Sequence, residues 1–391
     1  MYLIPGPVLG ITLPMSDKPA RPSQMQTLRK LAGADMPFWV LPWLMVLLVA
    51  GTIAQREIGL YEAERIFFSS WVLWMGPIPL PGGFLTLSIL TTLLSIKFLF
   101  FSRWSWQKAG INLTHLGVLL LLIGGMVTVM SSSEGYMPIP EGQKINRVFD
   151  YHTRKVSIFQ DKKVIWSEDF RKVESGTIAK TPLPFTVAVR DKIINARAVA
   201  REKEKVAKVL PYQGIASQIN FFANAPDKSD EANHNVLEIA VTGVSKDQDG
   251  LYFLSENVPE FPNFKVSGHV YEIRLERASI ELPFSIGLED VRRDNHPGMN
   301  MARGYESDIV IDDNDDQWPV SIRMNEPLRY RGKTFYQSSY IVDQTGAETT
   351  VLAVVENSGA IFPYLSSVII ALGLVIHLVM MGKRKQVWET E

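Results

Sequence analysis

The sequence predicts an integral membrane protein, an α-helical bundle of four transmembrane helices with a large β-rich extracytoplasmic domain between helices 3 and 4. Three observations predict this fold class. The apolar residues are concentrated in four blocks of 17 to 21 residues, the length that a helix needs to cross ~30 Å of hydrocarbon. The charged residues lie between the blocks. The long segment between the third and fourth blocks carries short alternating patterns that are typical of strands.

The first block, Phe38–Ala54, follows a tail rich in proline and polar residues, and residues 1–36 are expected to be a mobile cytoplasmic tail. Pro42 is close enough to the start of the block to be tolerated in a helix. A preamble of this length is too long for the n-region of a signal peptide, and two more blocks follow closely. We therefore expect the first block to be retained as a span.

The other blocks are Phe84–Phe101, Ile111–Met130 and Ile361–Met381. The second contains one charged residue, Lys97, near its end, where a lysine can reach the membrane interface. The third and fourth contain no Asp, Glu, Lys or Arg. The predicted boundaries are residues 37–131 for helices 1–3 with a short outer loop 55–83, 132–360 for the β-rich periplasmic domain, 361–381 for helix 4, and 382–391 for a basic cytoplasmic tail.

The distribution of Lys and Arg predicts the orientation. These residues precede the first block (Lys18, Arg21, Arg29, Lys30), lie between the second and third (Arg103, Lys108), and follow the fourth (Lys383, Arg384, Lys385). The loop after the first block balances Arg56 and Arg65 with three glutamates. Because positive residues favour the cytoplasmic side, both termini are expected in the cytoplasm and residues 132–360 outside. The chain is therefore expected to cross the cytoplasmic membrane several times.

The outer segment predicts an antiparallel sandwich or a distorted barrel. The expected strands are Lys155–Gln160, Val164–Glu168, Phe185–Val189, Val236–Val241, Leu251–Leu254, Val266–Leu275, Ser307–Ile311 and Thr349–Val355. Asp161-Lys162-Lys163 and Asp249-Gly250 are expected turns. One stretch, Ile194–Leu210, is predicted to be a helix because Glu204 and Lys208 form an i,i+4 pair.

The composition excludes several kinds of function. Without cysteine there is no disulfide, thiolate metal site, CxxC motif or CxxCH haem attachment. A net charge of −1 argues against binding to nucleic acid. The acidic run from Asp312 to Asp316 lacks the glycine and glutamate of a calcium loop, so a solvated turn is favoured. His296 lies beside Met299 and Met301, which are soft ligands suited to haem iron or copper, but an ordinary Pro-Gly turn is favoured there.

Two histidines inside the apolar blocks carry the most information. His115 lies four residues into the third block and His377 four residues before the end of the fourth. At 1.5 Å per residue, each is about 6 Å inside the cytoplasmic boundary. An ionisable residue in a span suggests a functional site, and two imidazoles at one level could ligate a membrane haem. The alternative without a cofactor is that both histidines form hydrogen bonds in the lipid headgroup region.

The helix faces distinguish the two histidines. His377 shares its face with Ser366, Ile370 and Gly373, and small residues permit close helix packing. On the third block the small face runs through Thr114, Gly117, Leu121, Gly124 and Thr128, whereas His115 shares a face with Ile111, Val118, Leu122 and Met126. That face would point to lipid in a lone bundle, so we expect a partner protein to cover it.

Several motifs resemble the ResB (CcsB) family of cytochrome c biogenesis proteins. In chain order they are Gly51-Thr52-Ile53-Ala54-Gln55, Thr114-His115-Leu116-Gly117, Glu134-Gly135 to Glu141-Gly142-Gln143, and Met324-Asn325-Glu326-Pro327-Leu328-Arg329-Tyr330-Arg331-Gly332 running into Phe335-Tyr336-Gln337-Ser338-Ser339-Tyr340. The last string is long and specific. The resemblance covers about residues 38–381 and includes the order of three spans, an outer domain and one span.

The resemblance implies that the chain handles haem b and supports its covalent attachment to apocytochrome c, together with a multi-span CcsA (ResC)-like partner. His115 then corresponds to the membrane histidine of the family and would bind the haem iron. The corresponding role of His377 as a second cofactor-binding residue stays open. The chain has no Trp-Gly…Trp-Asp string like that of the partner. It is therefore expected to be a non-autonomous subunit of a holocytochrome c synthase (haem lyase), with no catalytic residue of its own.

Two other functions remain open at this stage. The chain could be a haem-b electron carrier that uses His115 and His377, although no histidine lies in the outer half of any span to hold a second haem. It could instead be a non-catalytic membrane anchor or scaffold for a partner. The intramembrane histidines count against this last possibility.

Overall fold

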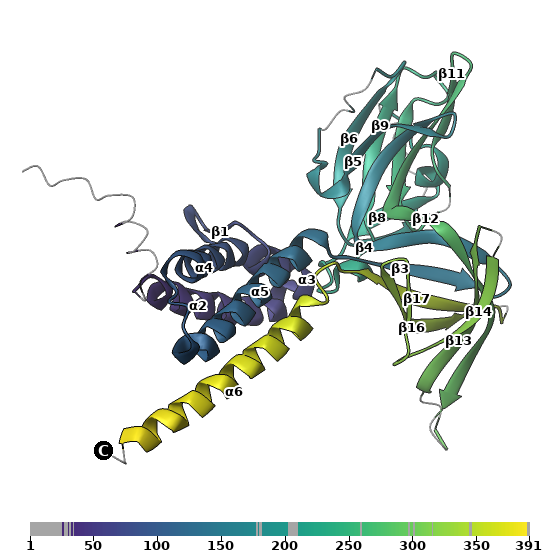
Figure 1. The fold of residues 1–391 in the computed structure, drawn as a ribbon. Helices are drawn as coiled ribbons and strands as arrows, with labels where there is room; N and C mark the ends of the chain where they lie inside the picture. The colour runs from purple at the N-terminus through teal and green to yellow at the C-terminus, as the bar shows by residue number, and fades with distance from the viewer. Residues whose placement is uncertain are drawn as a thin grey trace, which may run out of the picture.

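The computed structural model describes Gln26, Lys30, Gly33 and residues 35–388, apart from residues 177–178, 180–181, 202–209, 259, 296–297, 300–301, 315 and 344–345. Most of the predicted N-terminal tail therefore lies outside the described residues. Figure 1 shows helices at one end of the molecule and β-sheet at the other, with α6 running from the β-rich part to the C-terminus.

Four helices in the described part of the chain are long and apolar enough to cross a membrane. They are α2 (Asp35–Ile58), α4 (Gly83–Ile96, continued by the π-helical turn η2, Lys97–Phe101), α5 (Ala109–Ser131, preceded by the 3₁₀ turn η3, Trp106–Lys108) and α6 (Phe362–Trp388). These four helices confirm the four predicted blocks. Helix α5 packs against α6 along its length and also contacts α4, which in turn contacts α2.

The loop between α2 and α4 has structure of its own. It contains the short helix α3 (Leu60–Ala63), the π-helical turn η1 (Glu64–Phe68) and a hairpin of β1 (Val72–Met75) and β2 (Ile78–Pro81). Gly76 turns the hairpin with a φ of 62°, a conformation that glycine adopts at little cost.

The segment between α5 and α6 is rich in strands. The strands are β3 (Ser133–Pro140), β4 (Lys144–Gln160), β5 (Lys163–Asp169), β6 (Thr186–Ile193), β7 (Ala196–Ala200), β8 (Ile219–Ala223), β9 (Val236–Thr242), β10 (Gly250–Ser255), β11 (Asn263–Val266), β12 (His269–Asn295), β13 (Ala302–Asp313), β14 (Asp316–Arg323), β15 (Leu328–Tyr330), β16 (Lys333–Val342) and β17 (Glu348–Glu356). Three short 3₁₀ turns are η4 (Phe170–Lys172), η5 (Gly214–Ser217) and η6 (Asp230–Ala232). All pairings between named strands are antiparallel, as predicted.

Two long strands, β4 and β12, run through both lobes of this β-rich part (Figure 1). In the first lobe, the end of β4 and the start of β12 pack with β5 and β11 against the sheet β10-β9-β6 around a core that includes Ile158, Leu237 and Ile273. In the second lobe, the start of β4 and the end of β12 join β3 and β13–β17 around a core that includes Ile286 and Phe335. The lobes are therefore two packed cores built on shared strands.

The ladder between β4 and β12 is interrupted where the lobes meet. Arg277 pairs with Arg154, but Ser279 pairs with Phe149. Residues 150–153 of β4 thus bulge out opposite the single residue Ala278. Such a bulge bends a strand and redirects its side chains.

The structure corrects two predictions about local structure. Ala196–Ala200 is a strand that pairs with β8, so the predicted helix Ile194–Leu210 is wrong there, and its Glu204–Lys208 pair lies outside the described residues. Cross-strand pairing overrides the helix propensity of the alanines. The predicted strand Val266–Leu275 is two strands, because the positive φ angles of Ser267 and Gly268 form a turn between β11 and β12.

Candidate functional site

Both predicted haem ligands are half-buried in the described structure. His115 lies in the second turn of α5, and His377 lies in the second half of α6. The two helices pack antiparallel, with the end of α5 and the start of α6 beside the β-rich part (Figure 1). His115 is therefore near the end of α5 away from that part, and His377 lies in the half of α6 away from it.

Small residues form the contact between α5 and α6. The facing pairs are Gly110 with His377, Thr114 with Gly373, Gly117 with Ile370 and Gly124 with Phe362. A Cβ added at Gly110 would lie 2.5 Å from the backbone nitrogen of His377, closer than side chains tolerate. This is the small-residue packing that the sequence predicted, so the backbones approach one another closely.

The same pairing separates the two histidines. His377 packs at the level of Gly110, five residues before His115, or about 7 Å along the axis of α5. Five residues also turn a helix by about 140°, so His115 lies on the flank of α5 that is turned away from α6. The expectation that the two imidazoles share one level is wrong, because equal distances from the block ends did not fix the register of α5 against α6.

His115 has neighbours that suit a haem. Lys97, in η2, lies close enough to interact with it electrostatically. Ile111, on the same face, is 42% exposed, and Val118 and Leu122 are half-buried. An imidazole on an apolar face with a cation beside it could hold a haem iron, its macrocycle and a carboxylate. The described residues contain no group of three or more His, Asp or Glu that could hold a bare metal ion.

An apolar groove lies on another flank of α5, at the same end. Its volume is about 460 Å³, and its lining includes Trp104, Trp106, Leu113, Leu116 and Ile376. Asn112 is buried, and its side-chain nitrogen donates to the carbonyl of Arg103, which holds the link before α5 in place. The two tryptophans are 69% and 85% exposed. These two tryptophans were not among the predicted site residues. Their occurrence together in the short link before α5 could have indicated an apolar surface there.

A cavity lies where the two β lobes meet. It has a volume of about 260 Å³ and is lined by residues such as Glu134, Asp150, Lys155, Ile280 and Glu356. Asp150 belongs to the bulge in β4. Its lining includes Ser133 and Glu356, so it lies close to the points where the chain leaves α5 and approaches α6.

The first loop docks onto the β-rich part through Tyr61. The Tyr61 ring stacks on His152, with centroids 3.7 Å apart, and its hydroxyl accepts a hydrogen bond of 3.0 Å from Arg171. A Cβ on Gly59 would clash with the carbonyl of Lys228. We call these five residues the docking contact. It is a non-covalent contact between the helical and β-rich parts, in addition to the two places where the chain itself connects them, after α5 and before α6.

Asp230 lies at the centre of the charges behind the docking contact. It accepts hydrogen bonds from His152 at 3.1 Å and from Arg154 at 3.0 Å, and Arg171 is 3.6 Å away. Burial raises the pKa of Asp230, but the hydrogen bond from His152 and the two arginines outweigh it and hold the pKa below its usual range. No local sequence pattern indicates this cluster, because its members come from segments far apart in the chain.

The remaining candidates of the sequence analysis take structural roles where they are described. Asp313 accepts a hydrogen bond from Tyr330 and pairs with Arg331 at 2.7 Å in the β13–β14 hairpin. The predicted turn is present, but Asp313 is buried and not solvated. His269 pairs with the turn residue Asp161 at 2.6 Å. His296 and Met301 lie outside the described residues.

Comparisons with known proteins support the resemblance. Residues 255–349 match the ResB-like family, a segment that runs from the end of β10 to the start of β17 and contains the long motif from Met324 to Tyr340. Protein NrfI of Wolinella succinogenes is 32% identical over 101 residues, which cover 25% of this chain and 11% of NrfI. The chain thus matches about a tenth of that relative's length. The resemblance to the ResB family is confirmed.

Proposed function

From the ResB-like match at residues 255–349, we propose that this chain is the haem-handling subunit of a cytochrome c synthetase. The match supports a role in cytochrome c biogenesis. The finer proposal is that the chain works with a CcsA/ResC-like membrane partner, moves haem b outward, and supports its attachment to apocytochrome c. The family match is the observation that carries this proposal.

His115 is the proposed haem ligand of this chain. Haem, when bound, would supply an iron that imidazoles can hold and the vinyl groups that react with the cysteines of apocytochrome c. The imidazole of His115 would hold the iron on the open flank of α5, and Lys97 would pair with a propionate. Since His377 faces Gly110, on the side of α5 opposite His115, any second protein ligand would come from the partner.

The proposed orientation puts both termini in the cytoplasm of a bacterium and the β-rich part in the periplasm. The Lys and Arg distribution supports it. The structure adds that α5 ends and α6 begins beside the β-rich part (Figure 1), so that part lies on one side of any membrane that both helices cross. His115 then lies near the cytoplasmic side, where haem is made available.

The alternative of an electron carrier that uses His115 and His377 on one haem loses support. Along the axis of α5, His115 lies about 7 Å from the level of His377. His377 of α6 faces Gly110, whereas His115 lies on the side of α5 that is turned away from α6. The anchor hypothesis predicts no haem at all.

An absorbance spectrum distinguishes these functions. The chain is purified from membranes with and without a co-expressed CcsA/ResC-like partner, and the haem Soret and α bands are recorded in oxidised and reduced states. The proposal expects stoichiometric low-spin haem in the complex and much less in the chain alone. Full low-spin haem in the chain alone would favour two ligands within it, and none in either sample would favour the anchor.

A further inference from the structure

The hairpin of β1 and β2 lies in an unusually long uncharged stretch. No charged residue occurs from Ile66 to Ile96, a run of 31 residues, whereas one helical span needs only ~20. Helix α4 accounts for the second half of the run. The first half contains the hairpin and the residues that lead into it, which were predicted to lie in the outer loop 55–83.

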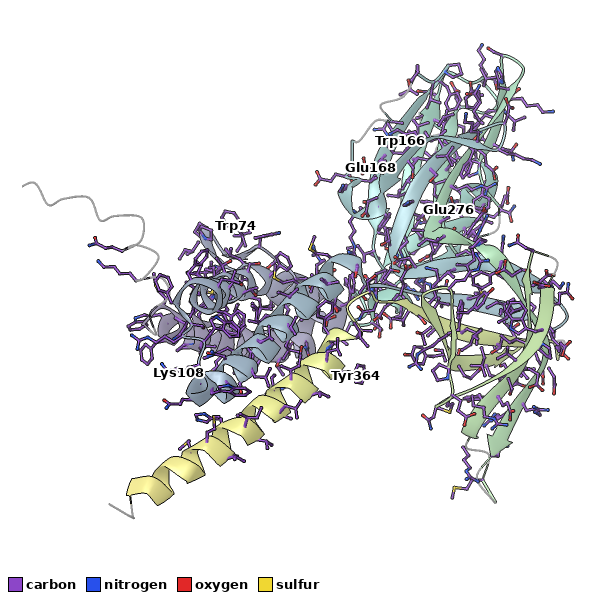
Figure 2. The ribbon with its side chains drawn as sticks, viewed as in Figure 1. Trp74, Lys108, Trp166, Glu168, Glu276 and Tyr364 are labelled. Atoms are coloured by element: carbon purple, nitrogen blue, oxygen red, sulfur yellow. The ribbon has the colours of Figure 1, made fainter. Side chains whose placement is uncertain are left out.

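Two contacts fix the depth of the hairpin beside α2. The indole nitrogen of Trp43 donates to the carbonyl of Pro81 at 3.0 Å. Trp43 lies 15 residues before Ile58, the end of α2, which is about 22 Å along the helix axis. Nearer that end, the ring of Phe68 packs against Gly51. The chain therefore folds back after α3 and runs along α2 to the middle of that span, and Figure 2 shows Trp74 beside the helices, away from the β-rich part.

The two edges of the hairpin differ. Gly82 N–H donates to the carbonyl of Trp71, and hydrogen-bonded and non-hydrogen-bonded residue pairs alternate along an antiparallel ladder. Pro79 and Pro81 therefore occupy non-hydrogen-bonded positions, where the N–H of another residue would point outward from β2. Proline has no N–H. The outer edge of β2 thus offers no free donor at these two positions, and its Pro81 carbonyl accepts the bond from Trp43 of α2.

The outer edge of β1 stays open. Val72 and Trp74 pair with the two prolines, so their N–H and C=O groups point away from β2. Among the described residues, no backbone partner lies on that side. The side chains nearby are apolar and exposed, with Trp71 59%, Trp74 66% and Met75 63% exposed.

Hydrocarbon cannot satisfy such an edge. Lipid-exposed open sheet edges do not occur within the apolar layer, because no water is there to pair with the free N–H and C=O groups. A protein segment with backbone donors and acceptors is complementary to it, in the manner of strand addition. The hairpin carries no charge with which a charged segment could pair, so an uncharged segment suits this edge.

We infer that the β1 edge is the surface on which a second membrane-embedded subunit packs, with an uncharged, locally extended segment against Val72 and Trp74. The inference rests on the proposed function, because the CcsA/ResC-like partner is the subunit that it assigns to this surface. It moves residues 71–82 from an outer loop into the membrane.

The chain has no cysteine, so single-cysteine variants report on single sites. Trp74→Cys is the test variant, and Val72→Cys repeats it on the same edge. Val368→Cys, on an exposed part of α6, is the lipid control, and Lys246→Cys, in the exposed β9–β10 turn, is the water control. Each full-length variant is studied in lipid vesicles, alone and in complex with the partner. Reaction with a charged maleimide measures contact with water, and collision of an attached nitroxide with oxygen measures contact with lipid.

The expected result has two parts. Trp74→Cys reacts with the maleimide an order of magnitude more slowly than Lys246→Cys, with or without the partner. Oxygen collision at position 74 falls several-fold on complex formation, while that at position 368 is unchanged. Labelling in denaturing detergent confirms that the thiol is intact.

Other results overturn the inference in distinguishable ways. Maleimide reaction at position 74 as fast as at 246 would place the hairpin in water. Unchanged oxygen collision in a complex that does form would mean that lipid covers the edge, and only this inference would fail. If the unmodified chain and the partner form no complex, the proposed function fails as well.

Discussion

At the scale of single residues, His115 is the side chain on which the proposed function depends. Its position in the sequence predicted a ligand in a membrane helix, and the structure adds an open flank, a nearby Lys97 and separation from His377. The surroundings of His115 thus favour a haem that is held jointly by His115 and a residue of another subunit.

His115→Ala is expected to remove most of the haem that co-purifies with the complex and to abolish cytochrome c maturation. The haem would lose the imidazole that holds it to this chain, while α5 should survive because alanine is the best helix former. The measurement is haem per complex from the absorbance spectrum. Added imidazole should restore part of the haem by filling the vacant position.

His377→Ala is the matched control, because His377 lies at the same end but against Gly110. Its haem content should stay near that of the unmodified chain. Equal loss in both variants would indicate that both ligands belong to this chain, and unchanged haem in His115→Ala would refute the ligand assignment.

Asp230 predicts a pH dependence of the docking contact. Its folded-state pKa lies below the usual 3.8, so its contribution to stability is present above that value and is lost as the pH falls through the depressed pKa. Protection of residues 59–62 from hydrogen exchange, measured relative to the intrinsic exchange rate at each pH, should therefore fall below about pH 4. Asp230→Asn should show the increased exchange already at pH 7 and little further change on acidification. Exchange that is the same in both proteins at pH 7 would contradict the role of Asp230.

At the scale of elements, adjacent glycines in α5 provide a test of its packing on α6. A Cβ on Gly124 would overlap Phe362, whereas a Cβ on Gly125 would meet nothing within 4 Å. Gly124→Ala should destabilise the α5–α6 pair by about 1–3 kcal/mol through overpacking, and Gly125→Ala should be neutral or slightly stabilising. Thermal unfolding in detergent measures both, and equal midpoints would contradict the helix contact.

The sequence predicted elements better than it predicted contacts between them. Apolar length located all four helices, and alternation located strands such as Phe185–Val189, because these signals are local. The depth of the β1–β2 hairpin depends on a bond between Trp43 and Pro81, and the docking contact depends on residues such as Tyr61 and His152 that are far apart in the chain. Likewise, the level of His377 against α5 depends on glycine packing and not on distance from a block end.

At the scale of the whole molecule, the orientation is directly testable. A reporter fused after Glu391 should be active only in the cytoplasm, and one inserted near Asp249, in the β9–β10 turn, only outside. The reason is the Lys and Arg asymmetry. The opposite pattern would refute both the orientation and the cytoplasmic side proposed for His115.

The β-rich part should be separable from the proposed haem site. Residues 132–360 expressed alone should give a β-rich circular dichroism spectrum, since both cores lie within this segment, and should bind no haem. Tight stoichiometric haem binding by this fragment would move the site outward, with His296 the first residue to test.

The two ends of the β-rich part lie side by side, because β3 and β17 pair from Ser133 with Glu356 to Pro140 with Thr349. Any tension that draws α5 and α6 apart would therefore load these hydrogen bonds one after another, as in opening a zipper, and not all together in shear. The first point of the β-rich part to open under such a pull is thus its junction with the helices. A pull on the helices would peel β3 from β17 at Ser133 first, beside the cavity that Glu134 and Glu356 line, while the cores of both lobes stayed intact.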